Sequence, residues 1–273
     1  MKLSWPSKLT LGAFTAVTLL FLYLPLAVVA RLSFNPAKSV NWPGWSGFTL
    51  DWWRQVWEVD GPKDALWTSV KVALVAMLFA LVLGTLAAMA MARFSFFGKN
   101  AVSFLLVLPI ALPGIVTGLA MQNTFSRTID LGIFSFKVGL GFHAVVLAHA
   151  TFCIVIAYNN VVARLRRTSP NLLEASADLG AQGTQTFRYI TFPLMRSALV
   201  AGGILAFALS FDEIVVTTFT AGAGVETLPK WMLSQLSNRQ NPLLPYVMAT
   251  FVMVVSIPLA WLAQRLSESG DGA

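Results

Sequence analysis

Six long apolar stretches, joined by shorter and more polar segments, dominate this chain and limit what it can fold into. A helix needs about 20 mostly apolar residues to cross a bilayer, and the stretches reach that length. Inside lipid every backbone polar group must be satisfied, and no stretch alternates with the period of two of a barrel strand. We therefore expect an all-α membrane protein, with six transmembrane helices in one domain over residues 1–273. The expected spans are 9–30, 66–92, 101–121, 138–162, 198–220 and 243–263.

The charge of the chain is sparse and unevenly placed. Only 11% of the residues are charged, whereas a soluble domain carries roughly 25%. The net charge of +7 would suit a protein that binds nucleic acid. The basic residues, however, lie in short segments between apolar runs, which is how a membrane protein fixes its orientation. We therefore expect contact with membrane lipid and none with nucleic acid.

The polar segments predict which side of the membrane each part faces. Basic residues concentrate in 93–100 and 163–197, and Lys2 and Lys8 precede the first span. The positive-inside rule then places both termini and segment 163–197 in the cytoplasm. The apolar run 9–30 is too long for the apolar core of a signal peptide, so we expect it to be retained as the first helix.

The first expected outer segment, residues 31–65, is rich in tryptophan. Indole rings favour the membrane–water interface, because they are flat, apolar and carry one donor. We expect residues 50–58 to form a short helix that lies on that interface, with direct contact to a partner as the alternative. The tryptophans of this segment are Trp42, Trp45, Trp52, Trp53 and Trp57.

The segment between the fourth and fifth expected spans is too polar to cross the membrane and too regular for an idle loop. Residues 174–193 read EASADLGAQGTQTFRYITFP. Small and apolar residues, among them Ala177 and Ala181, alternate with charges as in a short helix. Gly180 and Gly183 then permit a sharp turn. The pattern predicts a small helix beneath the membrane, bent at glycine, that fits a cleft on a cytoplasmic partner.

This segment resembles the EAA loop in permease subunits of ATP-binding-cassette (ABC) importers that work with a periplasmic binding protein. The family pattern is Glu-Ala-Ala, three residues, Gly, nine residues, Ile, one residue and Leu-Pro. Ser176 replaces the third Ala and Phe192 replaces the Leu. Serine keeps the small size that close approach needs, so docking should survive. The resemblance implies that the matching residues couple the chain to an ATPase subunit, together with Ala177 and Ala181. The matching residues are Glu174, Ala175, Gly180, Ile190 and Pro193.

The resemblance extends over nearly the whole chain, and it implies an architecture and a set of partners. The fold would be the six-helix permease fold of type I ABC importers, with a coupling helix between helices four and five, in the bacterial plasma membrane. The partners would be a second permease subunit, identical or related, two cytoplasmic ATP-binding subunits and an extracytoplasmic solute-binding protein. The sequence has no G-x-x-x-x-G-K-[ST] loop, so ATP and Mg²⁺ would be bound by the partner subunits. We expect no cofactor and no catalytic residue in this chain.

The stretch 210–229, SFDEIVVTTFTAGAGVETLP, resembles the SFDD-type signature of the spermidine/putrescine permeases. It implies that the solute is a polyamine or a similar cation. Permeases for aminophosphonates, ferric iron and other small solutes share much of this pattern, so these solutes remain alternatives.

Asp212 and Glu213 are the only acidic residues inside an expected span. A charge at that depth costs on the order of 3 kcal/mol on insertion scales, so such residues face a cavity or a partner. Successive helical residues point about 100° apart. On a helix, Glu213 shares a small, polar face with Ser210 and Thr217, whereas Asp212 shares an apolar face. We interpret Glu213, Ser210 and Thr217 as lining the solute pathway. Asp212 is interpreted as part of a buried pairing. The alternative is that both carboxylates are structural.

Two other classes of function compete with an importer permease. An ion-coupled secondary transporter would have no reason to keep the EAA spacing, and no internal repeat is evident. A membrane enzyme is disfavoured because the sequence lacks H-E-x-x-H and G-x-S-x-G motifs. His143 and His149 lie six residues apart, so on a helix they point away from each other. We expect structural roles for both and no metal site.

Overall fold

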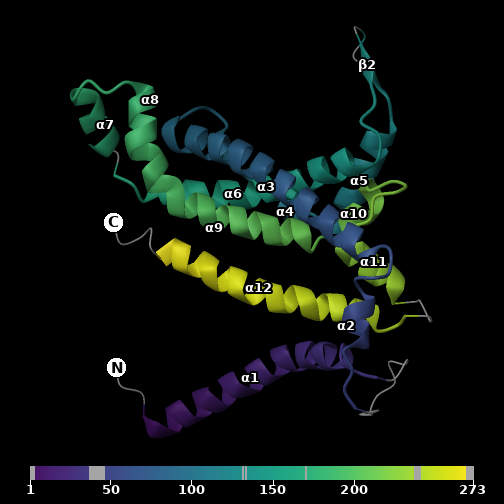
Figure 1. Ribbon diagram of the computed structural model, residues 1–273. Coiled ribbons are helices and arrows are strands. Elements are labelled where there is room, and N and C mark those ends of the chain that lie inside the picture. Colours follow the sequence, from purple (N-terminus) through teal and green to yellow (C-terminus); the bar gives the residue numbers. More distant parts are fainter. Residues whose placement is uncertain are drawn as a thin grey trace. The chain divides into compact units, whose positions relative to one another are not determined.

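The computed structural model describes residues 4–36, 47–130, 132, 134–169, 171–236 and 241–268, and these are almost entirely helical (Figure 1). The long helices are α1 (Trp5–Leu32), α3 (Pro62–Arg93), α4 (Lys99–Ala111), α5 (Gly114–Ser126), α6 (Phe142–Arg166), α9 (Phe192–Phe211) and α12 (Leu244–Glu268). The short ones are α2 (Asp51–Gln55), α7 (Asn171–Asp178), α8 (Gly183–Thr186), the π-helical turn η1 (Phe187–Thr191), α10 (Val215–Thr220) and α11 (Leu228–Gln235). An antiparallel hairpin joins β1 (Ile129–Asp130) to β2 (Ser135–Phe136).

The described helices confirm the expected all-helical membrane fold. Five of them are long and apolar enough to cross a membrane, and a sixth span arises if the bent pair α4–α5 is counted as one. By packing, the chain divides into two compact units. One holds residues 1–62 and 232–257, and the other holds residues 63–231 and 258–273. The sequence led us to expect one domain over residues 1–273.

The first unit contains α1, α2 and most of α12. Two of its tryptophans contact protein: Trp52 is buried and its Nε1–H donates to the Asn35 carbonyl over 2.9 Å. Trp57 meets Phe251 edge to face, with ring centroids 5.0 Å apart. The expected helix 50–58 is therefore present in part, as α2, and Trp52 packs inside the unit. Trp42 and Trp45 lie outside the described residues.

The second unit is built around α6, which is its most buried long helix. Glycines allow neighbouring helices to approach α6 closely. A Cβ added to Gly84 of α3 would lie 2.9 Å from the Ala157 Cβ, and one added to Gly202 of α9 would lie 3.3 Å from the Asn160 Cβ. This is how small residues work in membrane helices, where close backbone approach maximises van der Waals contact.

Prolines explain two departures from the expected spans. The span 101–121 is bent by 101° between α4 and α5. The bend follows because Leu112 precedes Pro113 and adopts an extended conformation, which is what proline imposes on the residue before it. At the other site, the helix that contains the fifth expected span begins at Gly183, well before residue 198. Within it the π-turn η1 ends at Thr191, two residues before Pro193, which has no N–H to donate in the α-helical pattern, so the helix widens there.

Two further boundaries differ because a local structure replaces the expected helix. The fourth span begins at Phe142 and not at Val138, since strand β2 and a turn that contains Gly139 and Gly141 come directly before it. The expected span 198–220 is interrupted, because α9 ends at Phe211 and α10 begins only at Val215. This second interruption contains both intramembrane carboxylates.

Candidate functional site

The EAA-like segment forms two short helices joined by a tight bend. α7 ends at Asp178, and α8 begins at Gly183 under a cap in which the Gln182 N–H donates to Gln185 Oε1 over 2.8 Å. Between them Gly180 adopts a left-handed φ of +75°. A helix followed by a glycine bend was predicted. Gly183 does not contribute to the bend, because it is already helical.

Gly180 satisfies the bend without touching the rest of the chain. A Cβ added to it would meet nothing within 4 Å among the described residues. Its left-handed backbone nevertheless disfavours any residue with a side chain. The glycine is therefore needed for conformation inside this chain, and the space around it is open to a partner.

Ser176, one of the two departures from the family pattern, joins the two arms of the bend. Its hydroxyl donates to the Leu173 carbonyl over 2.8 Å and lies 3.0 Å from the Thr186 hydroxyl of α8. Because the Ser176 proton is used on Leu173, Thr186 donates to Ser176. The sequence suggested only that serine is small enough to fit, and it missed this link.

The bend carries a row of apolar side chains that nothing in the described chain covers. Leu179 is 88% exposed and Tyr189 is 70% exposed. Figure 1 shows α7 and α8 at one end of the second unit, with the β hairpin at the opposite end. Exposed apolar residues on an otherwise polar projection indicate an interaction surface. Glu174, Ala175, Ala177, Gly180 and Pro193 are exposed there, while Ala181 and Ile190 are half-buried.

Three separate segments meet at this same end of the second unit. A cavity of about 500 Å³ lies under α7, and it is lined by Arg93 at the end of α3, Leu165 near the end of α6 and Glu174 of α7. The loops that we expected to be cytoplasmic are thus brought together in space. Which side of the membrane they face stays a prediction.

The two carboxylates lie where α9 ends and before α10 begins: Asp212 is the C-cap residue of α9, and Glu213 follows it in the break. Glu213 is half-buried, and its Oε1 accepts a hydrogen bond of 2.8 Å from the Val216 N–H, which caps α10. Asp212 is exposed, and its carboxylate has no hydrogen-bond or ion-pair partner among the described residues. Within the described chain the expected buried pairing of Asp212 is not present: Asp212 is the accessible carboxylate and Glu213 has the structural contact.

A buried histidine holds the two sides of this break together. His149 of α6 is fully buried, with Nδ1 2.8 Å from Ser210 Oγ and Nε2 2.9 Å from Thr217 Oγ1. Thr217 itself donates to the Glu213 carbonyl over 2.9 Å. Thr217 must therefore accept from His149, so Nε2 carries the imidazole proton and Nδ1 accepts from Ser210.

This network changes the role expected for the polar stripe. Ser210 and Thr217 are buried against His149, so in this structure they do not line an open path as we had expected. The sequence predicted a structural role for His149 but missed what it connects. The available signal was a histidine well inside an apolar span, together with hydroxyl residues on both sides of the Asp-Glu pair.

The sequence of this chain matches a family of transport proteins and several of its members. The family model for the binding-protein-dependent transport system inner membrane component matches residues 80–269. The spermidine/putrescine transport system permease protein PotC of Haemophilus influenzae is 32% identical over 260 residues, which cover 95% of this chain and 97% of that protein. The putrescine transport system permease protein PotI of Escherichia coli K12 is 32% identical over 252 residues, which cover 91% and 88%.

A solved structure shares the fold. It is a bacterial ABC transporter involved in the import of the acidic polysaccharide alginate, with a TM-score of 0.71 and 15% identity. The match covers 97% of this chain and 96% of that one. At this identity the likeness extends to the fold and not to the solute.

Proposed function

We propose a polyamine as the solute of this chain, which belongs to the family of inner membrane components of binding-protein-dependent transport systems. As the permease subunit of an ABC importer, the chain forms part of the pathway across the membrane. Two relatives with 32% identity are named for spermidine and putrescine or for putrescine. The observation that carries the proposal is Asp212, an exposed carboxylate in the break of an apolar span. A negative charge in that position attracts a polycation.

The coupling to ATP would run through the exposed bend of α7 and α8. Two cytoplasmic ATP-binding subunits would receive Leu179 and its neighbours, and these subunits would bind the ATP and Mg²⁺. A second permease subunit would complete the pathway, and a solute-binding protein would deliver cargo from outside. The chain itself would have no catalytic role.

A continuous helix supports this mechanism. α8, η1 and α9 together run without interruption over 29 residues, Gly183–Phe211. At 1.5 Å per residue this rod spans about 43 Å. A partner that pulls on α8 therefore moves the end of α9, where Asp212 lies. ATP binding would open the pathway outward and hydrolysis would reset it.

The orientation follows from the same proposal. The ATP-binding subunits are cytoplasmic, so α7 and α8 would lie in the cytoplasm, together with both termini. The basic residues near that end agree with the positive-inside rule. The chain would then be a multi-pass protein of the bacterial plasma membrane.

Competition for uptake tests the solute. Cells that lack their own polyamine importers would express this chain with its partner subunits, and uptake of labelled putrescine and spermidine would be measured. We expect unlabelled polyamines to compete, and an aminophosphonate or a ferric chelate to have no effect. Importer-dependent uptake of either alternative solute, without polyamine uptake, would replace the proposal.

A further inference from the structure

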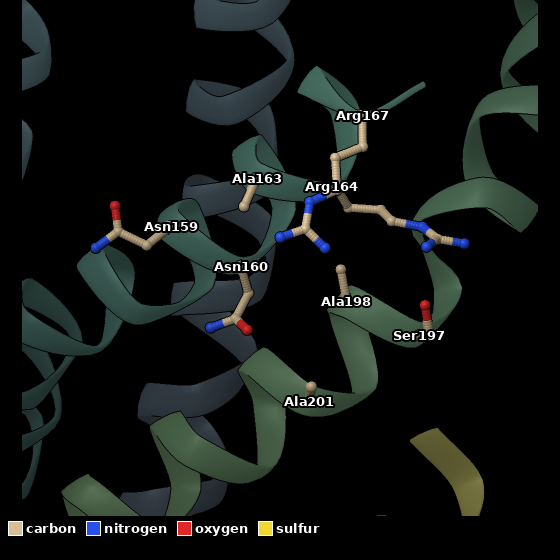
Figure 2. Close-up of a pocket in the computed structure, with 8 residues that line it drawn as sticks. All are labelled: Asn159, Asn160, Ala163, Arg164, Arg167, Ser197, Ala198 and Ala201. Atoms are coloured by element: carbon tan, nitrogen blue, oxygen red, sulfur yellow. The ribbon is translucent and has the colours of Figure 1, made fainter. Parts of the chain in front are cut away.

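A polar pocket that the transport mechanism does not use lies between α6 and α9 (Figure 2). Its volume is about 410 Å³. It is lined by Asn159, Asn160 and Arg164 of α6, by Arg167, which caps α6, and by Ser197 of α9, and three alanines complete the wall. No acidic residue is among these lining residues of the described chain, so the pocket is positively charged. We call it the α6–α9 pocket.

The spacing along α6 explains how the pocket forms. Asn160, Arg164 and Arg167 follow one another at intervals of four and three, which places them on one face of the helix. The opposing face of α9 offers only small residues. The two helices touch at Gly202, where an added Cβ would meet the Asn160 Cβ at 3.3 Å. Beyond that contact, toward α7, the small side chains of α9 leave the space between the helices unfilled. Arg164 and Arg167 border this space.

The polar groups of the pocket are positioned but not all satisfied within the chain. Arg164 Nε–H donates to the Leu194 carbonyl over 3.0 Å, which fixes this guanidinium at the start of α9. The Arg167 guanidinium, the Asn159 amide and the Ser197 hydroxyl make no hydrogen bond or ion pair with another described residue. The donors therefore converge on a space from two helices.

The chemistry of these groups selects a ligand. Guanidinium groups bind phosphate through paired hydrogen bonds, and amide and hydroxyl groups add further donors. Two arginines repel a cation, so the pocket does not suit a polyamine. A phosphate is the anion that this donor set fits.

The depth of the pocket indicates where such a phosphate comes from. The lining residues occupy the last two turns of α6, within about 10 Å of its end, which is the depth of the lipid headgroups. The alanines give the wall an apolar part that matches a glycerol and acyl chain. Basic pockets between helices on the cytoplasmic side are typical sites for anionic lipid headgroups. We infer that the α6–α9 pocket binds the phosphate of an anionic phospholipid, such as phosphatidylglycerol or cardiolipin.

Lipid titration tests this site. The full chain, purified with its accompanying subunits and delipidated in detergent, would be titrated with dioctanoyl phosphatidylglycerol and with dioctanoyl phosphatidylcholine, and bound lipid would be counted by native mass spectrometry. We expect saturable binding of phosphatidylglycerol alone, without competition from inorganic phosphate. Loss of one hydrogen bond to a charged group corresponds to about tenfold weaker binding. Arg167→Gln should show that loss.

Matched variants separate a pocket from general surface charge. Arg166→Gln removes the same charge one position earlier in the chain. Arg166 is exposed and does not line the pocket, so phosphatidylglycerol should bind normally to this variant. Ala201→Leu fills the pocket without changing the charge and should abolish binding. If Arg167→Gln and Arg166→Gln weaken phosphatidylglycerol binding equally, the lipid is held only by diffuse attraction to surface charge. Unchanged phosphatidylglycerol binding in Arg167→Gln and Ala201→Leu would overturn the site. Competition by inorganic phosphate would assign the pocket to a free anion, and a neighbouring subunit's acidic side chain seated there would assign it to a protein contact.

Discussion

His149 shows how one buried side chain shapes the pathway region. Its two ring nitrogens contact Ser210, which precedes the break, and Thr217, which follows it. Asp212 caps the end of α9 just before the break, and its N–H donates to the Ala208 carbonyl over 3.2 Å. A residue with no access to the solute therefore positions the residue that we propose meets it.

The first prediction concerns the clamp that His149 forms through its contacts with Ser210 and Thr217. His149→Phe fills a similar volume but leaves the hydroxyls of Ser210 and Thr217 without their partner, and an unsatisfied buried group costs about 1–3 kcal/mol. We expect a lower melting temperature of the purified chain and weaker polyamine uptake. His149→Gln retains one hydrogen bond and should recover part of both. His143→Phe is the control with the same change, and normal stability and uptake in His149→Phe would contradict the clamp.

The second prediction separates the two carboxylates. Asp212→Asn removes an exposed charge, whereas Glu213→Gln keeps the Oε1 atom that caps α10. A contact between charges at 4 Å is worth roughly 4 kcal/mol at an effective dielectric of 20, and a tenfold change in affinity needs about 1.4 kcal/mol. We expect Asp212→Asn to weaken the apparent affinity for a polyamine at least tenfold, and Glu213→Gln to change it little. Uptake against solute concentration, corrected for chain abundance, measures both. The reverse order would restore Glu213 as the solute contact.

At the scale of elements, the bend between α7 and α8 depends on Gly180. A tryptophan there would strain the left-handed backbone and fill the open space in which we propose that the ATPase subunit docks. We expect Gly180→Trp to leave the chain in the membrane while uncoupling ATP hydrolysis from transport.

Two further variants sharpen this third prediction. Gly180→Asn separates the two causes, because asparagine tolerates the left-handed conformation but still places a side chain in the proposed cleft. Gly183→Ala is the control, since Gly183 is helical and its surroundings are open. Transport and ATPase binding would be measured side by side. Normal transport by Gly180→Trp would remove the bend from the coupling surface.

The fourth prediction concerns orientation. In a chain with Cys153→Ala, a cysteine at the exposed Asp178 of α7 should resist an impermeant reagent added outside intact cells and react after lysis. A cysteine at Ala223, exposed in the turn between α10 and α11, should react from outside. Labelling of Asp178→Cys in intact cells would invert the topology.

The sequence predicted these elements unevenly, for physical reasons. Hydrophobic length was enough to predict the long apolar helices but not the breaks within two of them, and Gly180 was enough to predict the α7 bend. The break at 212–214 was missed because a continuous helix was assumed through residue 220, which assigned a helical face to Glu213 although Glu213 lies between α9 and α10. The cap at Gln182 at the start of α8 and the link from Ser176 to Thr186 were also missed, because both depend on side-chain geometry. The clamp at His149 joins residues more than 60 positions apart, which no local pattern predicts.

At the scale of the whole molecule, much of the surface remains apolar and uncovered. α1 has only Leu32 buried, and side chains such as Phe14 are 80% exposed within the chain. Such a surface needs apolar surroundings, which we propose are lipid and a second permease subunit. The 29-residue helix Gly183–Phe211 would then connect the proposed ATPase contact to the proposed solute contact. The exposed apolar surface is therefore what we expect of a chain that works as one subunit of a larger assembly.

The central claim is that ATP hydrolysis by partner subunits drives a polyamine through this chain. The most direct test is the ATPase activity of the complete importer, reconstituted in lipid with its solute-binding protein, with and without spermidine or putrescine. We predict that a polyamine stimulates hydrolysis in the native complex, and that Gly180→Trp abolishes this stimulation while the complex remains assembled. Hydrolysis that polyamines leave unchanged, but that an aminophosphonate or ferric iron stimulates, would contradict the claim.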